Sequence, residues 1–290
     1  MNGIVIVDKP TDWTSHDVVA KLRGVFRTKR IGHGGTLDPT ATGVLPIFIG
    51  RATRAAEFCE NAEKEYVAGI QLGIVTDTQD TQGNVLESRE VSSSLSAAEI
   101  KAVLSGFLGE SQQIPPMYSA VKIDGVRLYK LARQGIDIPR PARDIFISAL
   151  ELIDFGGSEF TIRVACSKGT YIRTLAHDIG QTLGMGGAMA SLRRTKAGAF
   201  SIDTALPLNE IIESVSNGMA QDIILPTDSI FAGYPALAVN PEDTQRIKNG
   251  AACRVDGVPD GKHRIYNPDG EFLALGEGIG GALRVIKSFF

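Results

Sequence analysis

One loop, residues 32–46, constrains this chain more than any other stretch. It has the sequence Gly-His-Gly-Gly-Thr-Leu-Asp-Pro-Thr-Ala-Thr-Gly-Val-Leu-Pro and contains a single acid, Asp38. Its glycines admit backbone angles that are closed to other residues, while Pro39 fixes its own φ and directs Asp38 towards an extended conformation. A strand-like run follows at residues 44–49. The pattern predicts a stiff loop with one carboxylate, which suits a nucleophile or a general base.

Other uses of this loop also fit the residues. Asp38 followed by Pro39 is a good helix start, with Asp38 as the N-cap, and spacing alone favours that interpretation over catalysis. The glycines suggest a phosphate-binding loop, but no Gly-Lys-Ser/Thr follows them. His33 and Asp38 have the chemistry of metal ligands, but no second His or Cys lies at ligand spacing. From the residues alone, the helix cap and the catalytic carboxylate both stay open.

Residues 32–45 resemble the catalytic motif of the TruB family of pseudouridine synthases, G-H-x-G-x-L-D-P-x-A-x-G-x-L, and match every fixed position. The resemblance implies that Asp38 is the essential aspartate and the nucleophile. It also implies that the target base is flipped out of its loop, and His33 is suited to support that arrangement.

The segment before this loop also resembles the family. Residues 9–15, Lys-Pro-Thr-Asp-Trp-Thr-Ser, are similar to K-P-x-G-x-T-S, with Asp12 where the pattern has Gly. Lys9 is expected to be a loop lysine close to the active site, where it would bind substrate. Ser15 is expected to be the N-cap of a helix whose apolar residues fall at positions 18, 19, 22, 25 and 26.

A second candidate site residue, Tyr66, begins a predicted strand at residues 64–73. Tyr66, Ala68, Ile70 and Leu72 alternate along this segment and would share one face. A tyrosine in such a place is usually part of the core. The segment resembles the second TruB motif, which implies that Tyr66 stacks on the target uracil and helps to move a proton.

A helix predicted at residues 170–184, with Thr170 as its cap, carries two more candidates. Arg173 lies in its first turn and off its apolar stripe, where most arginines are exposed. Cys-Ser-Lys-Gly-Thr-Tyr-Ile-Arg, residues 166–173, resembles the third TruB motif. The resemblance implies that Arg173 pairs with the catalytic aspartate and that Tyr171 lines the uracil pocket. Leu-Arg-Arg-Thr, residues 192–195, resembles a further family stretch in which Leu192 contacts the base.

The predicted fold class is α+β. The resemblance implies a pseudouridine synthase core over residues 1–230, with a central, mainly antiparallel mixed sheet flanked by helices and loops. An insertion at about residues 112–143, with a basic helix at 126–134, would clamp an RNA stem-loop. Short strands and regular turns after Pro226 predict a small β-barrel, and residues 231–290 resemble a PUA-like RNA-binding domain.

Charge is distributed unevenly along the chain, although the net charge is only −3. Residues 21–54 carry seven basic residues and one acid, residues 122–143 six and two, and residues 163–196 six and one. Such runs suit either a phosphate-binding face or ordinary solvated helices. Three widely spaced cysteines and no CxxC pair indicate a reducing compartment. The apolar run at residues 4–7 is too short for a signal peptide or a membrane span.

Together, the motifs imply an isomerase that converts the uridine at position 55 in the T-loop of tRNA to pseudouridine. Asp38, Tyr66 and Arg173 would be catalytic, and substrate binding would involve His33, Tyr66, Tyr171, Leu192 and Lys9. The reaction is redox-neutral, so neither a metal nor an organic cofactor is expected. We expect a cytoplasmic monomer with no obligatory protein partner and no membrane contact. The alternatives are a guide-RNA-dependent synthase subunit and a tRNA-folding chaperone with secondary catalysis.

Overall fold

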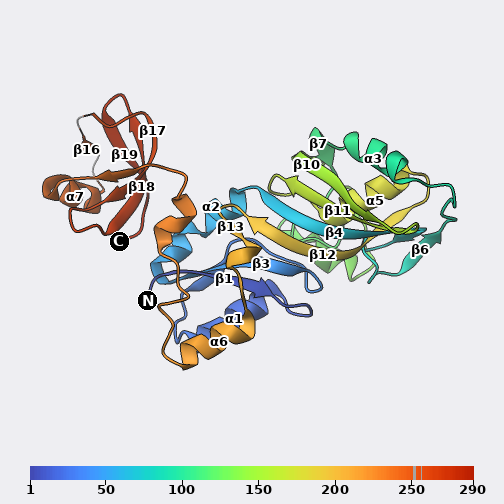
Figure 1. Cartoon of the computed structure of the whole chain (residues 1–290), viewed down its shortest axis with the longest axis horizontal. Helices are drawn as coiled ribbons and strands as arrows, with labels where there is room; N and C mark the ends of the chain where they lie inside the picture. The colour runs from blue at the N-terminus through green and yellow to red at the C-terminus, as the bar shows by residue number, and fades with distance from the viewer. Residues whose placement is uncertain (251–252, 256) are drawn as a thin grey trace. The chain divides into compact units, whose positions relative to one another are not determined.

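The structure, a computed structural model, describes residues 1–250, 253–255 and 257–290. The chain divides into two compact units, each with its own apolar core. The first unit holds residues 1–39, 43–60 and 197–290, and the second holds residues 40–42 and 61–196. Figure 1 traces the helices and strands of both units along the chain.

The sheet of the first unit is mixed and buried on both faces. Strand β1 (Gly3–Lys9) pairs antiparallel with β3 (Thr42–Ile49) and parallel with β14 (Leu206–Pro207), while β2 (Ile31–His33) pairs antiparallel with β3. Val5 and Val7 pack into the cluster formed with helices α1 (Ser15–Val25) and α6 (Leu208–Ser216), which lie beside β1 in Figure 1. Ile4 and Ile6 belong to a second cluster on the other face. Because both faces of β1 are buried, its residues form a continuous apolar run rather than an alternating pattern.

Short elements complete the core part of the first unit. A 3₁₀ turn and a short α-helix follow β3 directly. The short elements are η1 (Gly50–Ala55), α2 (Ala56–Asn61), β13 (Phe200–Ser201), η2 (Ile202–Thr204) and η3 (Thr227–Phe231).

The second unit is built on a sheet whose hydrogen-bonded order is β12-β4-β11-β10-β7. These strands span Gly187–Ala197, Lys64–Leu72, Glu159–Cys166, Arg143–Phe155 and Gly109–Gln113, in that order. The pairs from β4 to β7 are antiparallel. Helices α3 (Ala97–Ser105) and α5 (Ile172–Thr182) contribute to the same apolar cluster as the sheet, and β5 (Ile74–Thr76) pairs with β6 (Val85–Ser88). The alternation predicted for residues 64–72 is confirmed, since Ala68, Ile70 and Leu72 are buried and Tyr66 packs against their cluster.

The C-terminal strands form an open sheet within the described residues. Their order is β15-β17-β18-β19-β16, which begins and ends on strands that do not pair with each other. They span Ala236–Ala238, Gly261–Tyr266, Phe272–Ile279, Ala282–Ser288 and Cys253–Arg254, and helix α7 spans Pro241–Lys248. The β-rich character is confirmed, whereas the predicted closed, PUA-like barrel is not. The helix α7 was not predicted, although Asn240 caps it and Pro241 occupies its first turn.

Three predicted helix starts are wrong by one or two residues. Thr14, not Ser15, caps α1, because the Thr14 hydroxyl accepts a hydrogen bond from the backbone of Asp17. The Thr14 hydrogen bonds hold the pKa of Asp17 below its usual value. Thr170 donates to the carbonyl of Ser167 rather than capping α5, whose N-cap is Tyr171. The basic helix of the insertion, α4, covers only Leu128–Ala132.

Candidate active site

Asp38 lies in an irregular segment between β2 and β3. Pro39 and Thr40 form a turn, and β3 begins at Thr42, so no helix follows Asp38. The interpretation of Asp38 as a helix N-cap is therefore wrong. The Asp38 side chain is half-buried, and the neighbouring Leu37 is only 4% exposed.

Ser15 fixes the residue that precedes Asp38. The Leu37 backbone N–H donates to Ser15 Oγ at 2.8 Å, and the Ser15 hydroxyl donates to the Leu37 carbonyl at 3.2 Å. Ser15 is 1% exposed, so water does not compete for these bonds. One hydroxyl thus satisfies both backbone groups of Leu37 across 22 residues of sequence.

Two donors fix the residue that follows Asp38. The Pro39 carbonyl accepts hydrogen bonds from the Asp12 backbone N–H and from Lys9 Nζ, both at 3.0 Å. Because Pro39 also has a fixed φ, the backbone on each side of Asp38 is held in place.

Lys9 differs from its expected place in a loop. It is the last residue of β1 and is fully buried. Its ammonium group donates to the carbonyls of Pro10, Trp13 and Pro39. The structure therefore assigns it a supporting contact with the Asp38 loop, while its binding to substrate stays a prediction.

Asp12 supplies the conformation for which the family pattern uses Gly. Its φ is +63°, in the left-handed region that glycine adopts most readily and Asp tolerates. We expect Asp12→Gly to keep the free energy of unfolding within about 0.5 kcal/mol of wild type, since it relieves backbone strain but loosens the unfolded chain. A β-branched residue has no such tolerance, so Asp12→Val should destabilise the protein by about 1–2 kcal/mol. Urea unfolding of both variants checks this, and equal stabilities would contradict it.

His33 ends β2 and is half-buried, with its Nδ1 accepting a hydrogen bond from the Gly35 N–H at 3.4 Å. The backbone packs closely against the core here, since a Cβ on Gly34 would lie 2.8 Å from both Phe48 and the Cys59 sulfur. The imidazole is thus held against the glycine turn that leads to Asp38. Its predicted support of a flipped base stays a prediction.

In the second unit, Tyr66 and Leu192 lie on β4 and β12, which are neighbours in the sheet. Both are half-buried and pack against the same apolar cluster. The adjacent Glu65 carboxylate accepts a hydrogen bond from Thr195 Oγ1 at 2.7 Å. The structure therefore places two of the predicted base-contacting side chains on one cluster.

Gln113, at the end of β7, holds Tyr171 by its backbone. The Gln113 side-chain amide accepts from the Tyr171 N–H at 2.8 Å and donates to the Tyr171 carbonyl at 3.1 Å. Gln113 is 4% exposed. The sequence interpretation gave no role to this residue, whose partner lies 58 positions away.

Arg173 is buried, at 6% exposure, contrary to the exposure typical of its helix position. Its guanidinium donates to the carbonyls of Thr78 at 3.1 Å and Tyr118 at 2.9 Å, and its Nε lies 3.9 Å from the Asp80 carboxylate. A planar guanidinium reaches several acceptors at fixed angles. Arg173 therefore joins the 77–84 loop to the start of the insertion. Its predicted pairing with Asp38 stays a prediction.

The insertion is basic and exposed, and it contains a hairpin that was not predicted. Lys122–Ile123 pairs with Val126–Arg127, as strands β8 and β9, around a turn at Asp124 and Gly125. Both turn residues have positive φ, as an Asp-Gly hairpin requires. In the following helix, a hydrogen bond from Arg127 lowers the pKa of the half-buried Tyr129.

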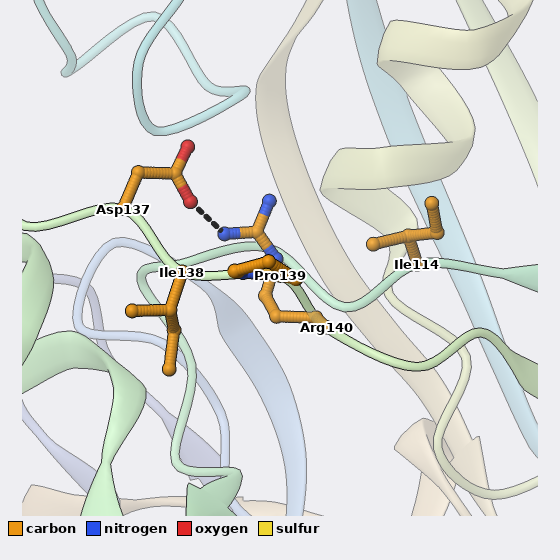
Figure 2. A pocket seen from close by; sticks show the side chains of 5 residues that line it. All are labelled: Ile114, Asp137, Ile138, Pro139 and Arg140. Carbon is orange, nitrogen blue, oxygen red and sulfur yellow. Dashed lines mark hydrogen bonds and ion pairs between the residues drawn. The ribbon is translucent and has the colours of Figure 1, made fainter.

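A cavity of about 500 Å³ lies beside the C-terminal part of the insertion. Figure 2 shows its lining by Ile114, Ile138 and Pro139, with the Asp137 carboxylate paired to the Arg140 guanidinium. No predicted catalytic residue lines this cavity, so it is distinct from the predicted site.

Other reactive side chains offer no competing site within the described part of the chain. No group of three or more His, Cys, Asp or Glu residues there is arranged to hold a metal ion. Cys59 and Cys166 are buried, and burial raises the pKa of the Cys166 thiol to about 11. Such a thiol is inert at neutral pH. The side chain of Cys253 lies outside the described residues. No described helix has the length and apolar character to cross a bilayer.

Comparison with known proteins gives consistent matches along the chain. A family model for the TruB family pseudouridylate synthase N-terminal domain matches residues 23–172, and one for the tRNA pseudouridylate synthase B C-terminal domain matches residues 173–232. The tRNA pseudouridine synthase B of Shouchella clausii is 41% identical over 279 residues, which cover 94% of this chain and 92% of the relative. That of Geobacillus kaustophilus is 40% identical over 280 residues, covering 93% and 98%.

Solved structures show the same core. A chain of a Cbf5-Nop10-Gar1 complex is 29% identical, with a TM-score of 0.76, and the match covers 99% of this chain and 85% of that one. A chain of an H/ACA RNP bound to a substrate RNA containing 2'-deoxyuridine is 26% identical, with a TM-score of 0.75 and the same coverage. These likenesses confirm the predicted core fold.

Proposed function

Because this chain belongs to the TruB family of pseudouridine synthases, and is thus a tRNA-modifying isomerase, we propose that it acts on the uridine at position 55 in the T-loop, with Asp38 as nucleophile. The proposal rests chiefly on the Asp38 loop. It presents one carboxylate between two residues whose backbone groups are bound by the buried side chains of Ser15 and Lys9. A reacting group gains most from such support, because small displacements of a nucleophile cost large factors in rate.

The proposed reaction exchanges one bond of the uracil for another. The bond between N1 and C1′ breaks, the base turns, and a bond between C5 and C1′ forms. The C5 proton is lost and N1 gains a proton, so electrons and atoms balance without an oxidant or reductant. The Asp38 carboxylate, as nucleophile, forms a transient bond to the substrate, and this bond breaks again as the product forms, so the carboxylate is regenerated.

The other proposed residues bind the target uracil or orient the Asp38 carboxylate. Tyr66 offers a stacking face, worth about 1–3 kcal/mol per base at comparable sites, and helps to move the proton from C5. Tyr171 and Leu192 line the uracil pocket, and His33 supports the flipped arrangement. Arg173 orients the Asp38 carboxylate by pairing with it. Flipping is needed because a base inside a folded loop does not expose N1 or C5 to a side chain.

The test is a pseudouridine assay on an unmodified tRNA transcript with purified wild-type protein, without guide RNA or a second protein. We expect one pseudouridine per tRNA, at position 55, and none in a matched transcript with cytidine at that position. Product elsewhere, with position 55 unmodified, would contradict the proposed site. Modification of the bare transcript would also exclude the guide-dependent alternative, which the likeness to chains from H/ACA and Cbf5 complexes raises.

A further inference from the structure

We infer that Ser15 is a positioning residue for the reaction: its hydroxyl sets the orientation of the peptide group that carries Asp38. This inference deepens the proposed function and rests on it. Ser15 lies outside the residues expected to touch the substrate, and its predicted role as a helix cap is taken by Thr14. Its buried hydroxyl is therefore not needed to begin α1.

The geometry of the contact supports this role. A hydroxyl can accept and donate at once, and Ser15 Oγ does both, towards the N–H and the carbonyl of Leu37. The Leu37 carbonyl belongs to the same peptide plane as the Asp38 nitrogen. Fixing both polar groups of Leu37 therefore restricts φ and ψ of Leu37, which set the position and direction of the Asp38 N–Cα bond.

Packing alone does not hold this peptide. The Leu37 side chain is 4% exposed and anchors the loop, but an apolar contact is non-directional and does not set the tilt of a peptide plane. Beyond Asp38, the Pro39 carbonyl is bound by Asp12 and Lys9. On the N-terminal side of Asp38, Ser15 is the only residue among the described contacts that bonds to the backbone of Leu37.

The neighbouring hydroxyls of Thr14 and Ser15 allow a matched comparison. The exposed Thr14 hydroxyl bonds to Asp17 and starts the helix, whereas the buried Ser15 hydroxyl bonds to Leu37. Thr14→Ala removes support for α1 and leaves the loop contact, while Ser15→Ala removes the loop contact and leaves the cap. A purely structural hydroxyl would affect the folded fraction, and a positioning hydroxyl would affect the rate at which folded enzyme reacts.

The experiment is single-turnover pseudouridine formation with saturating enzyme, in which amplitude reports the active fraction and the rate constant reports the reaction. Wild type, Ser15→Ala, Thr14→Ala and Asp38→Asn are compared at a temperature where circular dichroism shows all four folded. We expect Ser15→Ala to reach full amplitude with a rate constant about 10–100-fold below wild type, since misplacement by about 1 Å costs that much. Affinity for tRNA should stay within about threefold, because the interaction acts on the reacting group. Thr14→Ala should react at the wild-type rate.

The outcomes separate this inference from the proposed function. A wild-type rate constant for Ser15→Ala, or an equal slowing by Thr14→Ala, would overturn the positioning role. Reduced amplitude at an unchanged rate would do the same, because it indicates a folding defect. Turnover by Asp38→Asn would instead overturn the proposed nucleophile, whatever Ser15→Ala does.

Discussion

Replacement of Asp38 by Asn is expected to reduce pseudouridine formation by at least about 10⁴-fold, the scale of loss seen when a nucleophile is removed from other enzymes. The amide has nearly the same shape as the carboxylate but lacks its negative charge and nucleophilicity. The backbone contacts of Leu37 and Pro39 do not involve the Asp38 side chain and should persist. We therefore expect tRNA binding within about threefold of wild type, because the change acts on the chemical step. Quantitative pseudouridine detection and a filter-binding titration measure the two quantities.

A matched control is available in the same cluster. Asp12→Asn also removes one carboxylate, but Asp12 is exposed and contributes its backbone N–H to the Pro39 carbonyl, which the substitution keeps. Asn tolerates the left-handed conformation found at this position. We expect this variant to react at close to the wild-type rate. Comparable losses in the two variants would mean that loss of local negative charge, and not loss of a nucleophile, explains the effect.

Sequence patterns predicted the elements with strong periodicity and local caps. The strand of Tyr66 is confirmed, and the paired strands β10 and β11 and the capping box of Ser96 and Glu99 follow equally local patterns. Each is determined by residues within a few positions, where alternation or a cap is visible without the fold.

The elements that were missed have weak periodicity. Helix α7 buries only Asp243 and Ile247, so it has no apolar stripe to recognise, although its Asn-Pro start is a local signal. Strand β12 carries Arg193 and the almost fully buried Arg194 in a segment that reads as polar. The hairpin at residues 122–127 was missed because a basic helix was predicted over its second strand.

The residues of the candidate site also fall into those with a local sequence signal and those without one. Asp38, Tyr66 and Arg173 are identified by motif residues that stand together in the sequence. The residues that hold the neighbouring backbone are not, because Ser15 and Gln113 bind the backbone groups of Leu37 and Tyr171, which lie 22 and 58 positions away. A backbone acceptor carries no side-chain signature, so only the fold reveals such partners. This is why Lys9 and Ser15 were recognised as motif members but given the wrong local setting.

Lys9→Met should give a larger loss of stability than any of the other substitutions. Replacing a buried charge by an apolar side chain is neutral or favourable only when its partners are replaced as well. Here the carbonyls of Pro10, Trp13 and Pro39 would stay buried and lose a donor, at about 1–3 kcal/mol for each unsatisfied group. Even without full additivity, we expect the free energy of unfolding to fall by about 3 kcal/mol or more, and Tm by about 6–12 °C.

Lys21→Met is the matched control for this change. Lys21 is exposed on α1, so the same exchange of side chains there should move Tm by less than about 2 °C, as is usual for surface substitutions. Thermal unfolding followed by circular dichroism measures both variants. If Lys9→Met unfolds at the Lys21→Met temperature, the three carbonyls have found other donors. In that case the ammonium group does not hold the Asp38 loop, and any loss of activity in Lys9→Met must come from its predicted contact with the substrate.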